Sequence, residues 1–124
     1  MIAENTLIET AKAHAKYYLE EANEFYPFGI CLTEENKIVP VSLGLDEEFP
    51  NAREVYAELK GALEELIKKG EYIQAAVVSN ISIKQGNLDL DAVSIVILQK
   101  EEADIHFEYP YVKSTKNEII YQLD

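Results

Sequence analysis

The sequence predicts an α+β fold: a two-layer sandwich in which an antiparallel sheet of five to six strands carries two helices on one face, in the order α-ββ-α-ββββ. Three observations lead to this class. Two segments repeat apolar residues at helical spacing, the other apolar runs are short and bounded by turn residues, and the turns between successive strands are short enough to imply antiparallel neighbours. A chain of 124 residues is expected to form one domain, over residues 1–124.

The first helix is predicted over residues 5–24. Its apolar residues recur every three or four positions with charges between them: Leu7, Ile8, Ala11, Ala15, Tyr18, Leu19 and Ala22. Pro27 disfavours helical backbone at Tyr26, so the helix is expected to end by Phe25. From residue 28 to residue 33 the apolar period changes to two, which predicts a strand.

A hairpin is predicted after that point. Residues 34–37 form a polar turn, and residues 38–45 indicate the return strand. Because Pro40 has no amide hydrogen to donate to a ladder, this strand is expected at an edge of the sheet. Residues 46–50 are acidic and irregular, and they lead into the second helix.

The second helix has both of its ends marked in the sequence. Asn51 is a suitable N-cap, and Glu54 is placed to reach back in a capping box. Gly70 is placed as the C-terminal cap. The predicted buried stripe consists of Val55, Tyr56, Leu59, Leu63, Leu66 and Ile67.

The rest of the chain is predicted as strands and turns. Residues 72–84 and 92–99 are long apolar runs separated by turn residues, and the second run is nearly continuous, as in a central strand that is covered on part of both faces. Residues 105–111 alternate, and residues 118–123 form a last short strand.

Charge and composition discount several classes of partner. Asp and Glu number 23 and Lys and Arg 11, a net charge of −12, so nucleic acid would be repelled. Charges recur through the first twenty-five residues and break any apolar run suited to export or membrane insertion, which predicts a cytoplasmic protein without a membrane partner. The simpler interpretation is that the acidic residues keep the protein soluble. The more specific one is that they attract a basic partner.

The sequence indicates no cofactor and no catalytic constellation. It has neither a glycine-rich phosphate loop nor a nucleophile beside a base, so an enzyme is less expected than a binding protein. Cys31 is the only cysteine, which excludes an internal disulfide, and a packed, unreactive thiol is expected there. His14 borders the first helix stripe and is expected to pack rather than to act as a base.

Two short segments place a proline between aromatic rings. The first contains Tyr26 and Phe28, and the second contains Tyr109 and Tyr111. These four residues are the candidate ligand-binding or partner-binding residues, since tyrosine offers an apolar face and a hydroxyl tip. The alternative, that the rings pack in the core, is favoured because Phe28 and Tyr111 fall on the apolar side of their strands.

Asp104, His106 and Glu108 are the only candidate metal ligands that we single out. Alternate residues of a strand share a face, so the three could converge on a divalent cation. Ile105, Phe107 and Tyr109 form the opposite, apolar alternation, however, which favours a solvent-facing role for the acids and the imidazole.

Two resemblances accompany these patterns. Residues 24–29, with the run Phe-Tyr-Pro-Phe-Gly, resemble small bacterial α+β proteins that carry an aromatic-Tyr-Pro-Phe-Gly run after their first helix. The order of elements is similar to profilin-like and roadblock-like arrangements, in which a central antiparallel sheet carries helices. Neither resemblance implies a function.

Two functional hypotheses follow. The leading one is a non-enzymatic protein-interaction module, either a homodimer or a partner-binding protein such as an acidic immunity protein that neutralises a basic toxin. The rival is a small-molecule sensor or minor enzyme with a pocket between sheet and helices, lined by Tyr18, Tyr26, Tyr56 or Tyr109.

Overall fold

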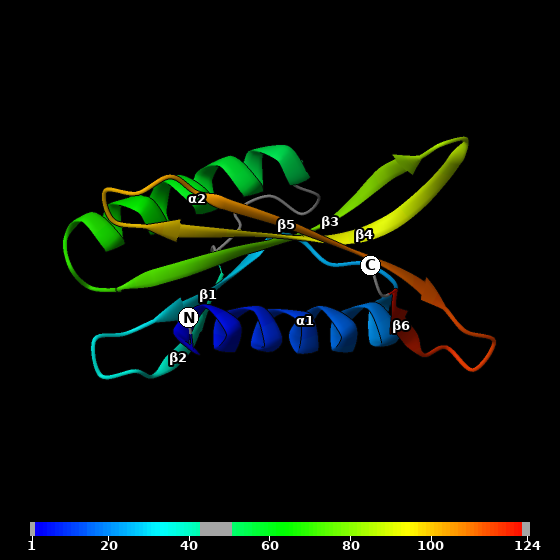
Figure 1. Ribbon diagram of the computed structural model, residues 1–124, viewed down its shortest axis with the longest axis horizontal. Coiled ribbons are helices and arrows are strands. Elements are labelled where there is room, and N and C mark those ends of the chain that lie inside the picture. The colour runs from blue at the N-terminus through cyan, green and yellow to red at the C-terminus, as the bar shows by residue number, and fades with distance from the viewer. Residues whose placement is uncertain (1, 43–50, 123–124) are drawn as a thin grey trace.

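The computed structural model describes residues 2–42 and 51–122, with side chains from Thr6 onward. This part of the chain forms two helices and six strands (Figure 1): α1 (Ile2–Ala22), β1 (Phe28–Leu32), β2 (Ile38–Val41), α2 (Ala52–Lys68), β3 (Gln74–Gln85), β4 (Leu88–Gln99), β5 (Ile105–Lys113) and β6 (Ile119–Tyr121). All neighbouring strands are antiparallel, in the order β2-β1-β3-β4-β5-β6. The predicted α+β class, element order and antiparallel sheet are confirmed.

The two helices lie on opposite faces of the sheet, so the prediction that both pack on one face is wrong (Figure 1). α1 packs with Ala76 and Val78 of β3, whereas α2 packs with the alternating residues Ala75 and Val77. The strand directions give the reason. Both β2 and β3 run antiparallel to β1 and flank it, so the connection between them has to cross β1 on one face. α2 makes this crossing, and α1 fills the other face.

A glycine lets α2 approach β1 closely. A Cβ atom built on Gly29 would lie 2.8 Å from Cδ1 of the buried Leu63, which is closer than van der Waals contact allows. Cys31 lies two residues further along β1 and is fully buried against the same helix. Burial raises the pKa of its thiol to about 12, because the thiolate would be desolvated. The predicted packed thiol is confirmed.

The ends of α2 are capped largely as predicted. The side-chain oxygen of Asn51 accepts hydrogen bonds from the amides of Arg53, at 2.8 Å, and Glu54, at 3.4 Å. Among the described residues, no carboxylate bond from Glu54 back to the Asn51 amide completes the capping box. Gly70 has a positive φ of 86°, and its amide donates to the carbonyl of Ile67 at 3.0 Å.

Some strand boundaries differ from the prediction. β2 is an edge strand that contains Pro40, as expected, but it ends at Val41. Residues 43–45 of the predicted strand, the predicted irregular segment 46–50 and Leu123 lie outside the described residues. β4 begins at Leu88 rather than at Ala92, so the β3–β4 hairpin is longer than predicted.

The sheet has two ends of different construction. At the covered end, which we define as β1 with residues 74–79 of β3 and 95–98 of β4, every residue is buried. At the open end, the later part of β3 and the earlier part of β4 extend beyond α2 (Figure 1). α1 continues under this region toward β6.

A set of polar contacts attaches β6 to α1. The carboxylate of Glu20 accepts hydrogen bonds from the Ile119 amide at 2.7 Å and from Lys16 Nζ at 2.9 Å. The Asn117 side chain donates to the Glu20 carbonyl at 2.7 Å, and the Tyr121 hydroxyl donates to the Lys12 carbonyl at 2.6 Å. The two bonds to the carboxylate lower the pKa of Glu20, chiefly the bond from the Ile119 amide and then the bond from Lys16.

Candidate functional site

Two of the four predicted aromatic residues lie in the core. Phe28 and Tyr111 are both buried in the cluster beneath α1. The Tyr111 hydroxyl donates to the side-chain oxygen of Asn80 at 2.8 Å. Burial is the main cause of the raised pKa of Tyr111. The packing role that the alternation favoured for these two rings is what the structure shows.

The other two predicted aromatic residues lie apart from each other. Tyr26 is exposed and lines a hollow of about 350 Å³ with Phe28 and Tyr18, beside Glu21 and Glu24. Tyr109 does not line this hollow. Its ring lies on β5 beneath the Lys12 ammonium, 4.5 Å from the ring centroid, and stacks with Phe107. The structure therefore places Tyr26 with Phe28, and Tyr109 elsewhere on the α1 side of the sheet.

The predicted metal candidates lie on one side of the sheet, with Asp104 just before β5 and His106 and Glu108 within it. Asp104 lies 3.3 Å from Lys60 Nζ of α2, and this carboxylate raises the pKa of the lysine. His106 and Glu108 are exposed on the same face. Within residues 2–42 and 51–122, no group of three His, Cys, Asp or Glu side chains is arranged to hold a metal ion. His14 packs against Phe28, with ring centroids 6.2 Å apart, as expected of a packing residue.

An apolar surface lies at the open end, on the side of the sheet that α2 covers elsewhere. The strand register places its members on one face, because they continue the alternation of Val77 and Val96 beneath α2. Leu88 is 64% exposed and Ile120 49% exposed. We call this surface the open sheet face and define it by Ile81, Ile83, Leu88, Leu90, Pro110, Val112 and Ile120.

The opposite side of the same strands is polar. There the β3–β4 hairpin presents Asn80, Ser82 and Lys84 on β3, and Asp89 and Asp91 on β4. An amphipathic hairpin normally turns its apolar side to the core and its polar side to water. Here α1 does not extend under the hairpin tip, and the apolar side is left without a covering helix (Figure 1).

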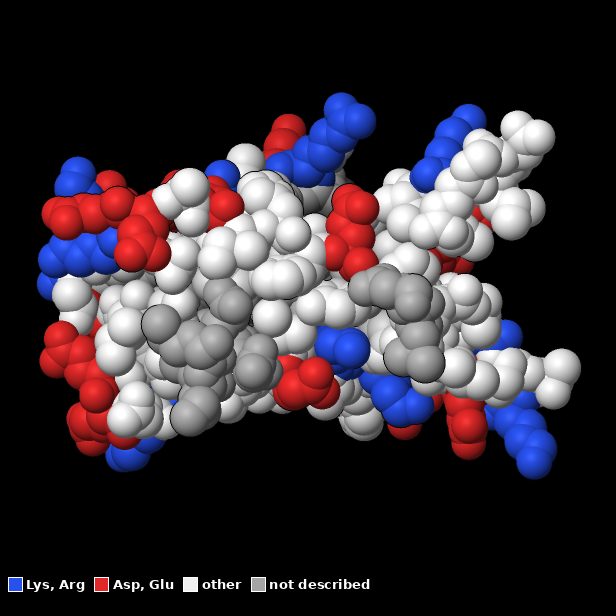
Figure 2. Space-filling model, in the orientation of Figure 1, with Lys and Arg blue, Asp and Glu red and all other residues white. Residues whose placement is uncertain are grey.

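The negative charge is concentrated away from the open sheet face. The strands and turns of the open end, residues 80–94 and 106–122, carry four carboxylates and three lysines. Figure 2 shows charged side chains crowded at the other end of the molecule, where Figure 1 places the C-terminal end of α2 and the β1–β2 and β4–β5 turns. Most of the net charge of −12 therefore lies outside the open end.

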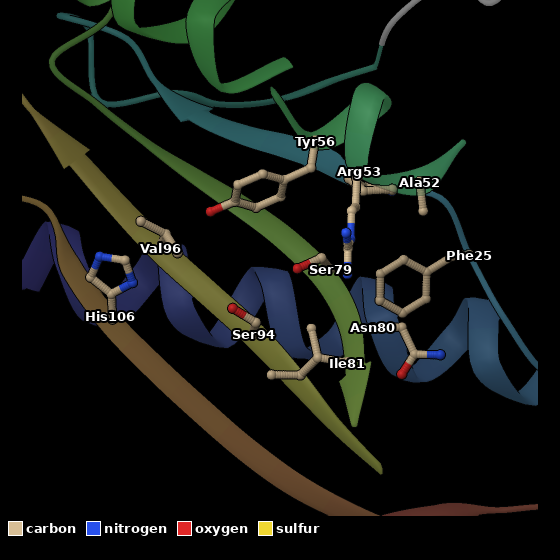
Figure 3. Close-up of a pocket in the computed structure, with 11 residues that line it drawn as sticks. Phe25, Ala52, Arg53, Tyr56, Ser79, Asn80, Ile81, Ser94, Val96 and His106 are labelled. Carbon is tan, nitrogen blue, oxygen red and sulfur yellow. The ribbon is translucent and has the colours of Figure 1, made fainter. Parts of the chain in front are cut away.

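A pocket of about 390 Å³ lies beneath the N-terminal end of α2, next to the open sheet face (Figure 3). Its roof is the first turn of α2, with Arg53 and Tyr56, and its floor is the sheet. Ser79 and Ser94 are cross-strand partners on that floor, with His106 on the next strand. Apolar walls come from Phe25, Pro27, Ile81 and Val96.

No family model matches this chain, and neither does a curated protein or a solved structure. The resemblances to aromatic-Tyr-Pro-Phe-Gly proteins and to profilin-like or roadblock-like arrangements remain predictions. None of the helices in the described part of the chain is long and apolar enough to cross a membrane.

Sequence reasoning found only part of the pocket. Tyr56 was predicted to line a pocket, and His106 was considered as a metal ligand. The sequence patterns did not single out Arg53, Ser79 or Ser94. The available signal was the presence of two serines within otherwise apolar strands, but only the register of β3 with β4 shows that they face each other.

Proposed function

We propose that this protein is a non-enzymatic interaction module that binds a second copy of itself through the open sheet face. One observation carries the proposal: the β3–β4 hairpin turns apolar residues away from α1 and toward solvent. Contiguous apolar surface beyond a few hundred Å² on a soluble protein marks interaction sites. Burying it is favourable by about 25 cal/mol per Å² of apolar surface.

The shape of the surface suits a partner of the same kind. Two sheets stack face to face at about 10 Å when each offers a row of alternating apolar side chains. A second copy offers such a row, and a two-fold axis through the surface would pair each patch with itself. In this arrangement the exposed Leu88, Val112 and Ile120 would be withdrawn from water.

Charge favours a second copy over a basic protein at this surface. The open end carries nearly balanced charges, so two copies would meet there with little repulsion. An acidic immunity protein would instead need its excess carboxylates near the contact, where they would steer a basic toxin. The crowded charges at the far end are poorly placed for that role at the open sheet face (Figure 2).

Light scattering over a range of protein concentrations tests the proposal. The expected result is a dimer that dissociates on dilution, and a Leu88→Glu variant that is monomeric at every concentration. Tyr17→Glu is the matched control, since Tyr17 is similarly exposed, at 61%, but lies on α1. A wild-type protein that stays monomeric at about millimolar concentration, or a Tyr17→Glu variant that is as monomeric as Leu88→Glu, would show that the open sheet face does not bind a second copy.

A further inference from the structure

The pocket beneath the first turn of α2 has one feature that packing does not explain. Ser79 is only 8% exposed, yet it lies in a strand whose neighbouring residues on the same face are Val77 and Ile81. Its hydroxyl has no hydrogen-bond partner among the residues that the structure describes. The Ser79 hydroxyl is open to the pocket rather than sealed in the core, because the buried, unpaired side-chain atom among the described residues is Gln74 Oε1. In Figure 3 the Ser79 oxygen points into the pocket.

The groups around Ser79 are mainly hydrogen-bond donors and positive charge. Arg53 extends from α2 toward the floor of the pocket (Figure 3), and no described carboxylate pairs with its guanidinium. Ser94 lies across the strand pair from Ser79, and the Tyr56 ring projects over the floor. The Tyr56 hydroxyl is protonated at neutral pH and can donate a hydrogen bond, and burial raises its pKa further.

We propose that this pocket binds a small organic anion: a carboxylate held by Arg53 and by the Ser79 and Ser94 hydroxyls, with an apolar body against Phe25 and Ile81. The ligand carboxylate would accept a hydrogen bond from the Ser79 hydroxyl, which faces the pocket. Guanidinium groups recognise carboxylates through charge-assisted hydrogen bonds, which are stronger than neutral ones.

Size and lining agree with this ligand class. A volume of about 390 Å³ lies in the range of small-molecule sites, about 300–1,000 Å³. The pocket combines apolar walls with a few polar groups, as such sites usually do. No carboxylate is among the described residues that line it.

The net charge of the protein and the nearby carboxylate of Glu108 both oppose an anion. The net charge of −12 repels it at long range, but physiological salt screens charges beyond about 8 Å. Glu108 follows Ser94 in the cross-strand row and is exposed. Since Glu108 does not line the pocket, it weakens the attraction without occupying the site. Its removal should therefore tighten binding of an anion.

Titration of the ¹⁵N-labelled protein with benzoate, followed by amide chemical shifts, tests the proposal. Benzamide has the same ring without the charge, and inorganic phosphate has charge without an apolar body. We expect saturable shifts with benzoate at residues around Arg53, Ser79 and Ser94, and at least tenfold weaker effects with benzamide and with phosphate. Equal binding of benzamide, or no saturable shift with benzoate at tens of millimolar, would overturn the proposal.

Charge variants separate the site from the general field of the protein. Arg53→Gln should weaken benzoate binding at least tenfold, while Lys68→Gln, which removes the same charge from the exposed far end of α2, should leave it unchanged. Glu108→Gln should strengthen binding. Equal weakening in Arg53→Gln and Lys68→Gln would mean that net charge alone governs the interaction, and the assigned site would be wrong. The wild-type-like amide spectrum of each variant establishes that it is folded.

Discussion

The covered end and the open end of the sheet are built from the same strands, but only one of them is a closed core. At the covered end β1, β3 and β4 lie between α1 and α2, and both alternations of each strand are buried. At the open end the same β3 and β4 continue past α2 and keep apolar residues on the uncovered side. α2 is therefore too short to cover the whole apolar side of β3 and β4.

The two ends of the sheet should therefore contribute to different properties, the covered end to folding stability and the open end to binding a partner. Residues between the two helices should determine the free energy of unfolding, because their burial is complete in the single chain. Residues of the open sheet face should contribute little to it, because they remain partly exposed until a partner covers them. Substitutions at the two ends should therefore separate the two properties.

The largest expected effect compares two leucines. Leu63→Ala removes a fully buried side chain from beneath α2 and should lower the free energy of unfolding by about 2–5 kcal/mol. Leu88→Ala removes the same atoms at the open end, where the side chain is 64% exposed, and should change it by less than about 0.5 kcal/mol in the monomer. Urea denaturation at low protein concentration measures both. Similar losses of unfolding free energy in the two variants would show that the open end contributes as much to stability as the covered end.

The next effect compares two glycines. Gly29→Ala places a methyl group 2.8 Å from Leu63, and overpacking of this kind costs about 1–3 kcal/mol. Gly61→Ala should instead stabilise the protein by about 0.5–1 kcal/mol, since Gly61 lies within α2 with no atom within 4 Å of the added methyl group. Thermal unfolding distinguishes the opposite signs, and a stabilising Gly29→Ala would show that α2 does not approach β1 so closely.

A smaller effect is expected at the boundary between the two ends. Asn51→Ala removes the side-chain acceptor that caps the Arg53 and Glu54 amides, and it should cost about 1 kcal/mol. Asn51→Asp keeps a capping oxygen and should be close to the wild type. Circular dichroism during urea denaturation follows the change. Equal destabilisation by both substitutions would indicate that the cap bond is not the cause.

The smallest effect is a dependence on pH from the attachment of β6. The folded-state pKa of Glu20 is lowered from its ordinary value of 4.5, chiefly by the Ile119 amide. A lowered pKa gives a stabilisation that is present above the ordinary value and is lost as pH falls through the folded-state value. The melting temperatures of wild type and Glu20→Gln should therefore converge as pH is lowered from 6 to 3.

The matched control for this measurement is Glu21→Gln, which removes one charge from the neighbouring exposed position. If Glu21→Gln shows the same convergence as Glu20→Gln, general charge rather than the contacts with β6 would explain it.

The sequence predicted most elements because their signals are local. The stripe of α2, its Asn51 cap and the alternation of β5 each depend on residues a few positions apart, and the structure confirms them. The length of β4 was underestimated because Asp89 and Asp91 interrupt its apolar run on the polar side of the hairpin.

The placement of the helices depends on pairings between distant segments, and the sequence left it undetermined. The nearly continuous apolar run of residues 92–99 predicted that this strand is buried on both faces of the sheet. It did not indicate which element packs on each face. That follows only from β1 pairing with both β2 and β3, which forces α2 across it.

The candidate site was predictable to a still smaller degree. Arg53 lies far along the chain from Ser79 and Ser94, and no local motif marks any of the three as a site residue. They line one pocket because α2 begins above the point where β3 and β4 place two serines opposite each other. The open sheet face likewise requires the register of four strands.

Amide chemical shifts of the free protein, recorded over a wide range of protein concentration, test most directly whether the open sheet face is the interaction surface. If the open sheet face binds a second copy, concentration-dependent shifts will be concentrated at residues 81–92 of the β3–β4 hairpin and at residues 110–120. Amides of α1, including those around the exposed Tyr17, should stay constant. Shifts confined to α1, or a spectrum that does not change with concentration, would contradict it.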